Sequence, residues 1–179
     1  MPRRAKLTRT KTGLAPAGGG WFVVNAARAQ WFRNERFGMA CVFEGARRFT
    51  QLGINIRVLD PGQANCLYHS ETSQEGFLVL SGSCRLLIEE QEIRLRAWDF
   101  VHCPPGTKHV FLGAGRKPCV ILMVGARRPG EKISYPVSRL AQRHGAGAMK
   151  RTSSPRVAYA DSPRWLPARG NLDKVCPGK

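Results

Sequence analysis

The sequence has no apolar run long enough to cross a membrane as a helix, which takes about 20 residues. Its longest, Pro118–Ala126, has the length of a strand. Its six cysteines include no C-x-x-C pair and fit no compact disulfide framework, and no apolar stretch of about 7–15 residues follows the basic N-terminus, as a secretory signal would require. We therefore expect a cytoplasmic protein with buried free thiols and no membrane span.

Acidic residues are scarce at both ends of the chain. Met1–Thr12 carries five Lys or Arg and no acid, residues 127–179 carry twelve against three, and residues 13–126 contribute only +3 of the net +17. Basic tails attract nucleic acid or anionic surfaces through counterion release. Because no nucleic-acid-binding module accompanies them, solvated arms are the favoured interpretation, and binding of nucleic acid or an acidic partner is the alternative.

Helical periodicity is scarce as well, and short strand-like runs dominate. From Leu52 onward, alternating or fully apolar runs recur at intervals of about 8–12 residues with turn residues between them, which is typical of a β-sandwich or barrel. In one of these runs Ile54, Ile56 and Val58 alternate with polar neighbours, and the turn residues Asp60-Pro61-Gly62 end it, which is typical of a strand. Earlier, Trp21–Ala26 is predicted to be a strand, and residues 28–36 a helical turn or loop.

Three regions follow from this pattern. Residues 1–20 end in a glycine-rich stretch and are predicted to be a flexible basic arm. Residues 21–126 are predicted to form one all-β domain. Residues 127–179 contain one short predicted helix, with Ser138 as N-cap and Gly145 as its stop, and continue as a proline-rich basic tail.

The residues that can carry chemistry gather in two runs of the β domain. His69 and Glu71 are two apart, so on a strand they share a face, and Glu75 follows four residues later. His109 follows a Pro-Pro-Gly turn. Two imidazoles with one or two carboxylates suit a divalent first-row metal such as Mn, Fe, Ni or Zn, but spacing alone does not force His109 to meet His69. No other known catalytic motif is present: the sequence lacks G-x-S-x-G, a phosphate-cradling loop and H-E-x-x-H.

His102 is the remaining histidine of the β domain and the one candidate for a catalytic role. It lies two residues before Pro104, so it could share an inward face and act as a general base or support a metal ligand. The favoured alternative is an outward or hydrogen-bonded core histidine.

These two runs resemble the paired motifs of the cupin superfamily. The first motif has the form H-x-H-x3-E-x6-G and the second contains P-x-G-x2-H. The matching positions are His69, Glu75 and Gly82 in the first motif and Pro104, Gly106 and His109 in the second. Three positions depart from the family: Glu71 stands at the second histidine, Trp98 replaces the glycine that leads the second motif, and Gly113 stands at its trailing asparagine.

The resemblance implies a single jelly-roll β-barrel, with its motif core at residues 55–125, that binds a divalent metal inside. It also implies a homodimer and a small-molecule ligand or substrate. For Glu71 three possibilities stay open: it joins His69, Glu75 and His109 as a fourth ligand, it points to solvent, or the site has lost its metal. The four-ligand set is favoured.

Three functions are compatible with this sequence. The first is a metal-binding barrel that acts on or binds a small polar molecule, such as a sugar derivative or an organic acid. The second is a non-catalytic barrel that binds or senses a small molecule. The third is a scaffold whose basic tails bind nucleic acid or an acidic partner.

Overall fold

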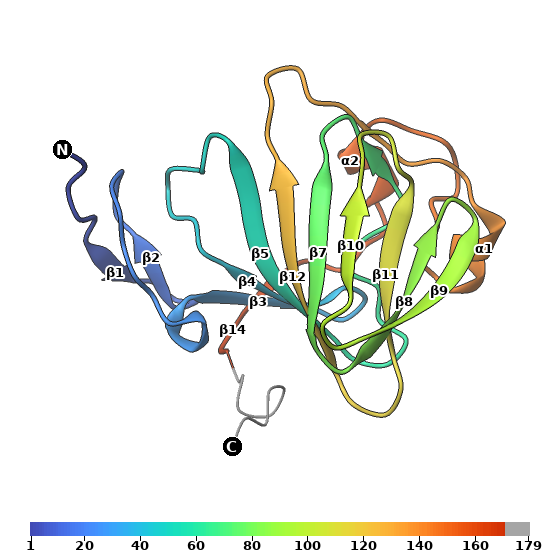
Figure 1. Cartoon of the computed structure of the whole chain (residues 1–179), viewed down its shortest axis with the longest axis horizontal. Helices are drawn as coiled ribbons and strands as arrows, with labels where there is room; N and C mark the ends of the chain where they lie inside the picture. Colours follow the sequence, from blue (N-terminus) through green and yellow to red (C-terminus); the bar gives the residue numbers. More distant parts are fainter. Residues whose placement is uncertain (171–179) are drawn as a thin grey trace.

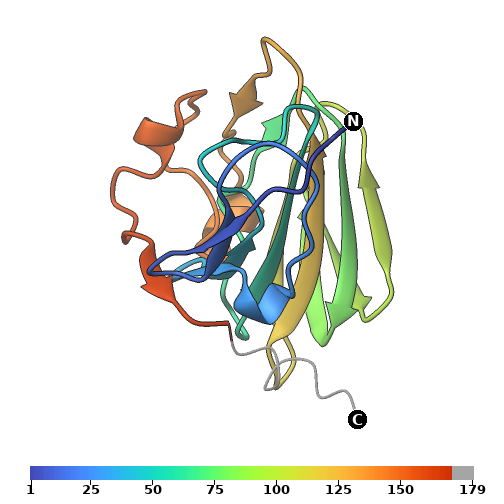
Figure 2. The same cartoon turned by 90° about the vertical axis from the view of Figure 1, so that its left-hand side faces the viewer.

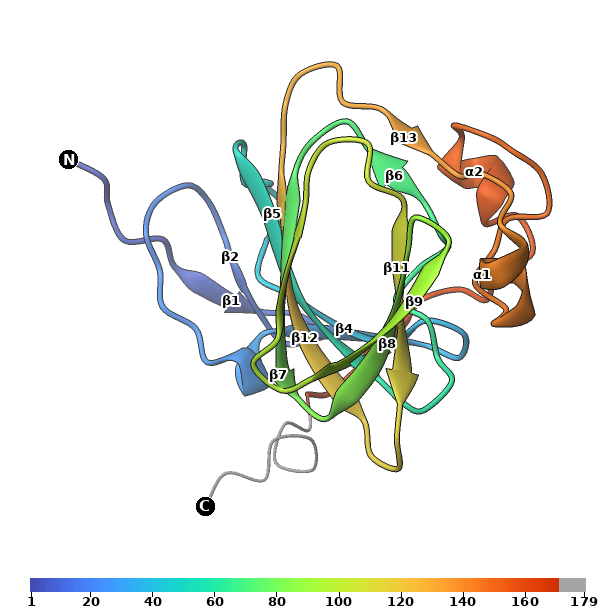
Figure 3. The same cartoon turned by 45° about the vertical axis from the view of Figure 1, so that its right-hand side comes forward.

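A computed structural model describes residues 1–170 of the chain. The predictions for Cys176 and for the last part of the 127–179 tail therefore lie outside the described residues. Strands dominate, as expected, and two antiparallel sheets face each other (Figure 3).

The larger sheet has seven strands. In spatial order they are β10 (Phe100–Cys103), β7 (Glu75–Ser81), β12 (Cys119–Ala126), β5 (Leu52–Leu59), β4 (Gly38–Val42), β3 (Gln30–Asn34) and β14 (Leu166–Ala168). The smaller sheet has three strands, β11 (His109–Ala114), β8 (Ser83–Ile88) and β9 (Gln91–Arg96). The chain passes from the first sheet to the second at Gly82, whose φ of 73° permits the tight turn between β7 and β8.

The expectation of one closed barrel is corrected by this arrangement. Between the two sheets lies only a two-stranded ladder, β6 (Ser70–Glu71) with β13 (Ile133–Ser134), together with isolated bridges. Backbone pairing therefore does not run continuously around the molecule. Packing of side chains joins the two sheets instead.

The core between the sheets is built from β-branched, aromatic and sulfur-containing side chains. Phe77 and Val79 of β7, Ile121 and Met123 of β12, and Phe111 of β11 belong to one buried cluster. The rings of Phe77 and Phe111 lie 4.7 Å apart between centroids and hold the two sheets together.

The smaller sheet is also covered on its outer face. Leu87, Val110 and Leu112 pack there against Tyr135 and Ala141, and Ala141 belongs to the helix α1 (Arg139–Arg143). Ser138 caps this helix by accepting a hydrogen bond from Ala141 N at 3.1 Å, as the sequence suggests. A second short helix, α2 (Pro155–Ala158), lies on the same side of the molecule (Figures 1 and 3).

The N-terminal segment covers part of the other side of the molecule (Figure 2). Residues 1–20, predicted to be a flexible arm, contain a hairpin of β1 (Leu7–Arg9) and β2 (Leu14–Pro16). The predicted strand Trp21–Ala26 is wrong: Trp21 forms a single isolated bridge with Arg4, and a 3-10 helix, η1, follows at Ala26–Arg28.

Strand β3 is a second departure, since residues 28–36 were expected to form a turn or loop. Trp31 in β3 is fully buried and its Nε1 donates a hydrogen bond to Ala26 O at 2.8 Å. Local composition did not reveal this strand because its stability comes from pairing with β4 on one side and β14 on the other. The C-terminal segment thus returns to the large sheet.

Among the described helices, none is long and apolar enough to span a membrane.

Candidate metal centre

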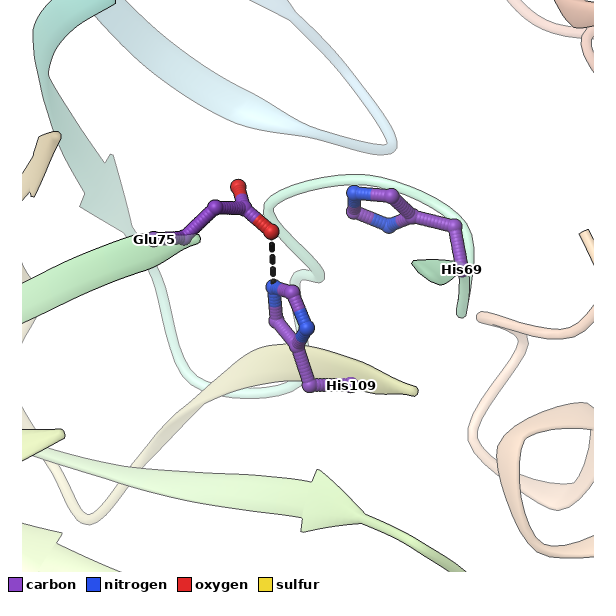
Figure 4. A group of neighbouring side chains, drawn as sticks. All are labelled: His69, Glu75 and His109. Atoms are coloured by element: carbon purple, nitrogen blue, oxygen red, sulfur yellow. Dashed lines mark ion pairs between the residues drawn. The ribbon is translucent and has the colours of Figure 1, made fainter. Parts of the chain in front are cut away.

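Three residues from separate segments converge at one end of the space between the sheets. His69 immediately precedes β6, Glu75 begins β7 and His109 begins β11. One potential ligand atom from each lies within 4.8 Å of the others (Figure 4). The structure thus brings together three of the four residues that the cupin resemblance implies as metal ligands.

Backbone pairing brings the two histidines together across forty residues of sequence. His69 and His109 form an isolated antiparallel bridge in which each N–H donates to the other's carbonyl, at 3.2 and 2.8 Å. Their ring centroids lie 5.0 Å apart. The sequence motif contains both residues, but only this bridge sets their separation.

Both imidazoles are oriented by backbone carbonyls. Nδ1 of His69 lies 2.8 Å from Leu67 O, and Nδ1 of His109 lies 3.1 Å from Thr107 O. A carbonyl oxygen can only accept, so each Nδ1 carries the proton and donates it. In the neutral tautomer each Nε2 then turns an unprotonated lone pair toward the cluster, as a metal-ligating histidine does.

Burial keeps these imidazoles neutral and opposes the charge on the carboxylate beside them. Burial and the neighbouring His109 lower the pKa of His69 to about 4, and burial lowers the pKa of His109. Burial, together with Glu71 and Glu131, raises the pKa of Glu75 to about 8. The cluster therefore lacks positive charge of its own.

The donor set fits a cation. Nε2 of His109 is buried and makes no hydrogen bond, and its close neighbour is Glu75 Oε2 at 3.5 Å. A neutral imidazole lone pair and an ionised carboxylate are both acceptors, so in the ionised form of Glu75 neither satisfies the other. A divalent ion between them would satisfy both atoms and would favour the ionised form of Glu75.

Glu71 lies at the margin of this cluster. Its Oε1 is 3.7 Å from His69 Nε2, and its backbone carbonyl accepts a hydrogen bond from Gly106 N at 2.7 Å. The Glu71 side chain faces the same cavity as the three clustered residues, but it is not within the 4.8 Å group. Its role as a fourth ligand stays a proposal.

His102 does not join the site. It lies on β10 opposite Gly76, is exposed, and lines the outer surface of the large sheet with Leu78 and Phe100. The structure thus places the catalytic candidate outside the cavity, in the outward position that the sequence favoured.

A cavity of about 350 Å³ adjoins the cluster. Besides the cluster and Glu71, its lining includes polar residues that the sequence did not single out: Asn55, Arg57, Asn65, Arg127, Glu131, Tyr135 and Tyr159. Arg127 is engaged by both carboxylate oxygens of Glu44. Tyr135 and Tyr159 come from the C-terminal segment, so the region outside the predicted β domain helps to form the cavity.

Strand β5 turns its polar face to the cavity. Asn55 and Arg57 line the cavity, whereas Ile56 and Val58 pack on the other side of the sheet against Trp31 and its neighbours. The alternation in the sequence marks these two faces but does not say which of them is inner. The apolar face can be the outer one because the N-terminal segment and β3 bury it.

Comparison with known proteins agrees with this architecture. The family model described as a cupin domain matches residues 55–125. Among solved structures, the polyketide cyclase RemF from Streptomyces resistomycificus is similar over 62% of this chain and 83% of its own, with 15% identity and a TM-score of 0.52, which supports the fold. No curated protein matches the chain.

Two further solved structures cover shorter parts. A proposed sugar phosphate isomerase from Acidithiobacillus ferrooxidans is 28% identical over 48% of this chain, with a TM-score of 0.46. A sugar phosphate isomerase from Silicibacter pomeroyi is 26% identical over 53%, with a TM-score of 0.49. The chain covers only 56% and 62% of the lengths of these two proteins.

Proposed function

On the premise that this chain belongs to the cupin superfamily through residues 55–125, we propose that it binds one divalent metal and, beside it, a small polar molecule. His69, Glu75 and His109 would hold the metal, with Glu71 as a fourth ligand. One observation carries the proposal: the buried Nε2 of His109 has no hydrogen-bond partner and lies 3.5 Å from the Glu75 carboxylate.

The ligand set selects among metals by its chemistry. Two imidazoles and two carboxylates form a harder donor set than three imidazoles and one carboxylate, which favours Mn or Fe over softer ions. Such a metal, when bound, would act as a Lewis acid on a ligand oxygen.

The thiol of Cys66 lies 3.5 Å from His69 Nδ1. Because burial raises its pKa, Cys66 stays a neutral neighbour of the site.

Residues around the cluster suit a polar ligand of modest size. The cavity of about 350 Å³ has Glu131, Tyr135 and Tyr159 in its wall, so hydroxyl and carboxylate groups surround any bound molecule. A sugar derivative or an organic acid has matching hydroxyl and carbonyl oxygens. We place the substrate or ligand in that class.

Metal analysis of the purified chain after mild dialysis tests the site. We expect close to one divalent ion per chain, and a loss of most of it in His109→Ala and in Glu75→Ala. His102→Ala is the matched control, because that histidine lies on the outer surface, and it should retain the parent metal content. Equal metal content in all four proteins would refute the proposal.

A non-catalytic binding or sensing role uses the same cavity. The departure at Glu71 from the family's histidine favours it, since altered ligands change the reactivity of a metal site. A small molecule that raises the melting temperature and is recovered chemically unchanged supports this alternative.

We also propose that two chains form a homodimer through the outer face of the large sheet. That face exposes apolar side chains of Leu52 and Phe100, which are 41% and 66% exposed, beside Leu78 and Leu122. Exposed apolar patches of this kind mark interaction sites.

Binding of nucleic acid through the basic tails is an alternative that we do not favour.

A further inference from the structure

Strand β5 directs two unpartnered polar side chains into the cavity of the proposed metal site. Nε and Nη1 of Arg57 and Oδ1 of Asn55 are buried and form no hydrogen bond. Within residues 1–170, Arg57 takes part in no ion pair. Burying a guanidinium without a partner destabilises a fold, so its presence points to a partner that is not part of the chain.

The groups around Arg57 contact its guanidinium but do not neutralise its charge. Its Cζ lies 4.9 Å from the centre of the Trp165 ring, which packs against the guanidinium plane. The ionisable groups that act on it most directly are Cys66 and Tyr159. Both are neutral near pH 7, because burial raises the pKa of each. Among the described residues, no carboxylate forms an ion pair with the guanidinium.

Arg57 and the metal cluster line one cavity of about 350 Å³, which allows one small molecule to contact both. Cys66 belongs to the same lining, and its Sγ is 3.5 Å from His69 Nδ1. Glu71 and Glu75 complete the wall on the side of the cluster.

We propose that Arg57 binds the carboxylate of a small hydroxy acid whose other oxygens face the metal cluster. This assignment rests on the proposed function, because the cluster supplies the second contact. The planar fork of an arginine matches a carboxylate with two parallel hydrogen bonds. The unpartnered Oδ1 of Asn55, two residues along the same strand, accepts a hydrogen bond from a hydroxyl of the same ligand.

The charge balance of the cavity favours a monoanion. Arg127, the other arginine in the wall, is already engaged by Glu44, so Arg57 alone is available to an anion. The lining carries three carboxylates, Glu71, Glu75 and Glu131. With one divalent ion and the Arg57 guanidinium, the three carboxylates bring the net charge of the lining to zero. A bound carboxylate then adds one negative charge and a doubly charged phosphate adds two, so the lining favours the monoanion over the dianion.

Calorimetric titration of the full metal-loaded chain tests the assignment. The probes are lactate and D-gluconate, their neutral counterparts lactamide and D-glucose, and inorganic phosphate. We expect at least one acid to bind about tenfold or more tightly than its neutral counterpart, and Arg57→Met to abolish that preference. Arg94→Gln, which removes an exposed arginine of β9, is the charge-matched control and should keep it.

Two further measurements separate this inference from the metal site and from misfolding. Arg57→Met should keep the parent metal content, and it should melt at or above the parent temperature because it removes an unpartnered buried charge. The inference is overturned if neither acid outbinds its neutral counterpart, if Arg57→Met binds both acids as the parent does, if only phosphate binds, or if Arg57→Met melts well below the parent. If the parent protein binds no metal, the proposed function is refuted. The titration alone then decides whether Arg57 binds a carboxylate.

Discussion

Glu71 is the residue at which this chain departs most clearly from the cupin motif. A carboxylate there adds a negative charge next to His69, with Glu71 Oε1 at 3.7 Å from the imidazole Nε2. Burial and the charge of Glu131 raise the pKa of Glu71. A cation would relieve that unfavourable burial, so the substitution is consistent with a site that keeps its metal.

Replacing Glu71 by Gln tests whether it is a ligand. The change preserves shape and removes the charge, so the affinity for Mn²⁺ should fall by about tenfold or more. Competition with a chelator of known affinity measures the change. Glu131→Gln, which removes a carboxylate elsewhere in the cavity wall, is the control and should have a smaller effect. An unchanged affinity in Glu71→Gln would reduce the ligand set to three residues.

Trp98 is the second departure, and it carries backbone strain. Its φ is 74°, in the left-handed region, at the position where the family has glycine, and its side chain is 74% exposed. A side chain in this region costs about 1–2 kcal/mol. The free energy of unfolding of Trp98→Gly should therefore be about 1 kcal/mol higher than that of Trp98→Ala, because alanine keeps the backbone strain and glycine does not. Urea denaturation compares the two, and equal stability would contradict the strain.

At the scale of elements, an ion pair fixes a long connection of the large sheet. Arg127, just after β12, hydrogen-bonds both carboxylate oxygens of Glu44 and the carbonyl of Phe49. Glu44 follows β4, and its carboxylate also accepts from Phe49 N at 2.6 Å. This pair closes the long connection between β4 and β5 onto the end of β12.

The Glu44–Arg127 pair predicts a pH-dependent contribution to stability. Burial alone would raise the pKa of Glu44, but the hydrogen bonds from Arg127 and Phe49 outweigh it, and the pKa is lowered. A lowered folded pKa stabilises the fold fully above the ordinary value of 4.5 and loses that effect as pH falls through the folded value. Glu44→Gln should cost about 1–3 kcal/mol at pH 7.

Denaturation curves recorded from pH 7 to pH 3 test this expectation. The difference between Glu44→Gln and the parent should shrink as pH drops below 4.5. Glu92→Gln is the control: its pair with Arg85 is more exposed and should contribute less than about 1 kcal/mol. A difference for Glu44→Gln that stays constant over the whole range would contradict the pair's role.

At the scale of the whole molecule, the exposed outer face of the large sheet is the expected contact between chains. Phe100→Lys places a charge on this face at the edge strand β10 and should convert a dimer into a monomer, measured by light scattering. Ile93→Lys is the control, because Ile93 is 42% exposed on the other sheet. A parent protein that is monomeric at all accessible concentrations would refute the dimer.

The sequence by itself determined the strand-rich fold, through period-two alternation and turn residues. The resemblance of its two runs to the cupin motifs named His69, Glu75 and His109, which cluster in the structure. The tertiary structure decided three features that local rules do not specify: the inner face of β5, the distance between the two histidines and the wall of the cavity. Whether β5 turns Asn55 and Arg57 or its isoleucines inward depends on what covers its outer face, and residues 20–45 cover it. The distance between His69 and His109, and the wall that Tyr135 and Tyr159 add, are set by pairing and packing between segments far apart in the chain, which no local pattern records.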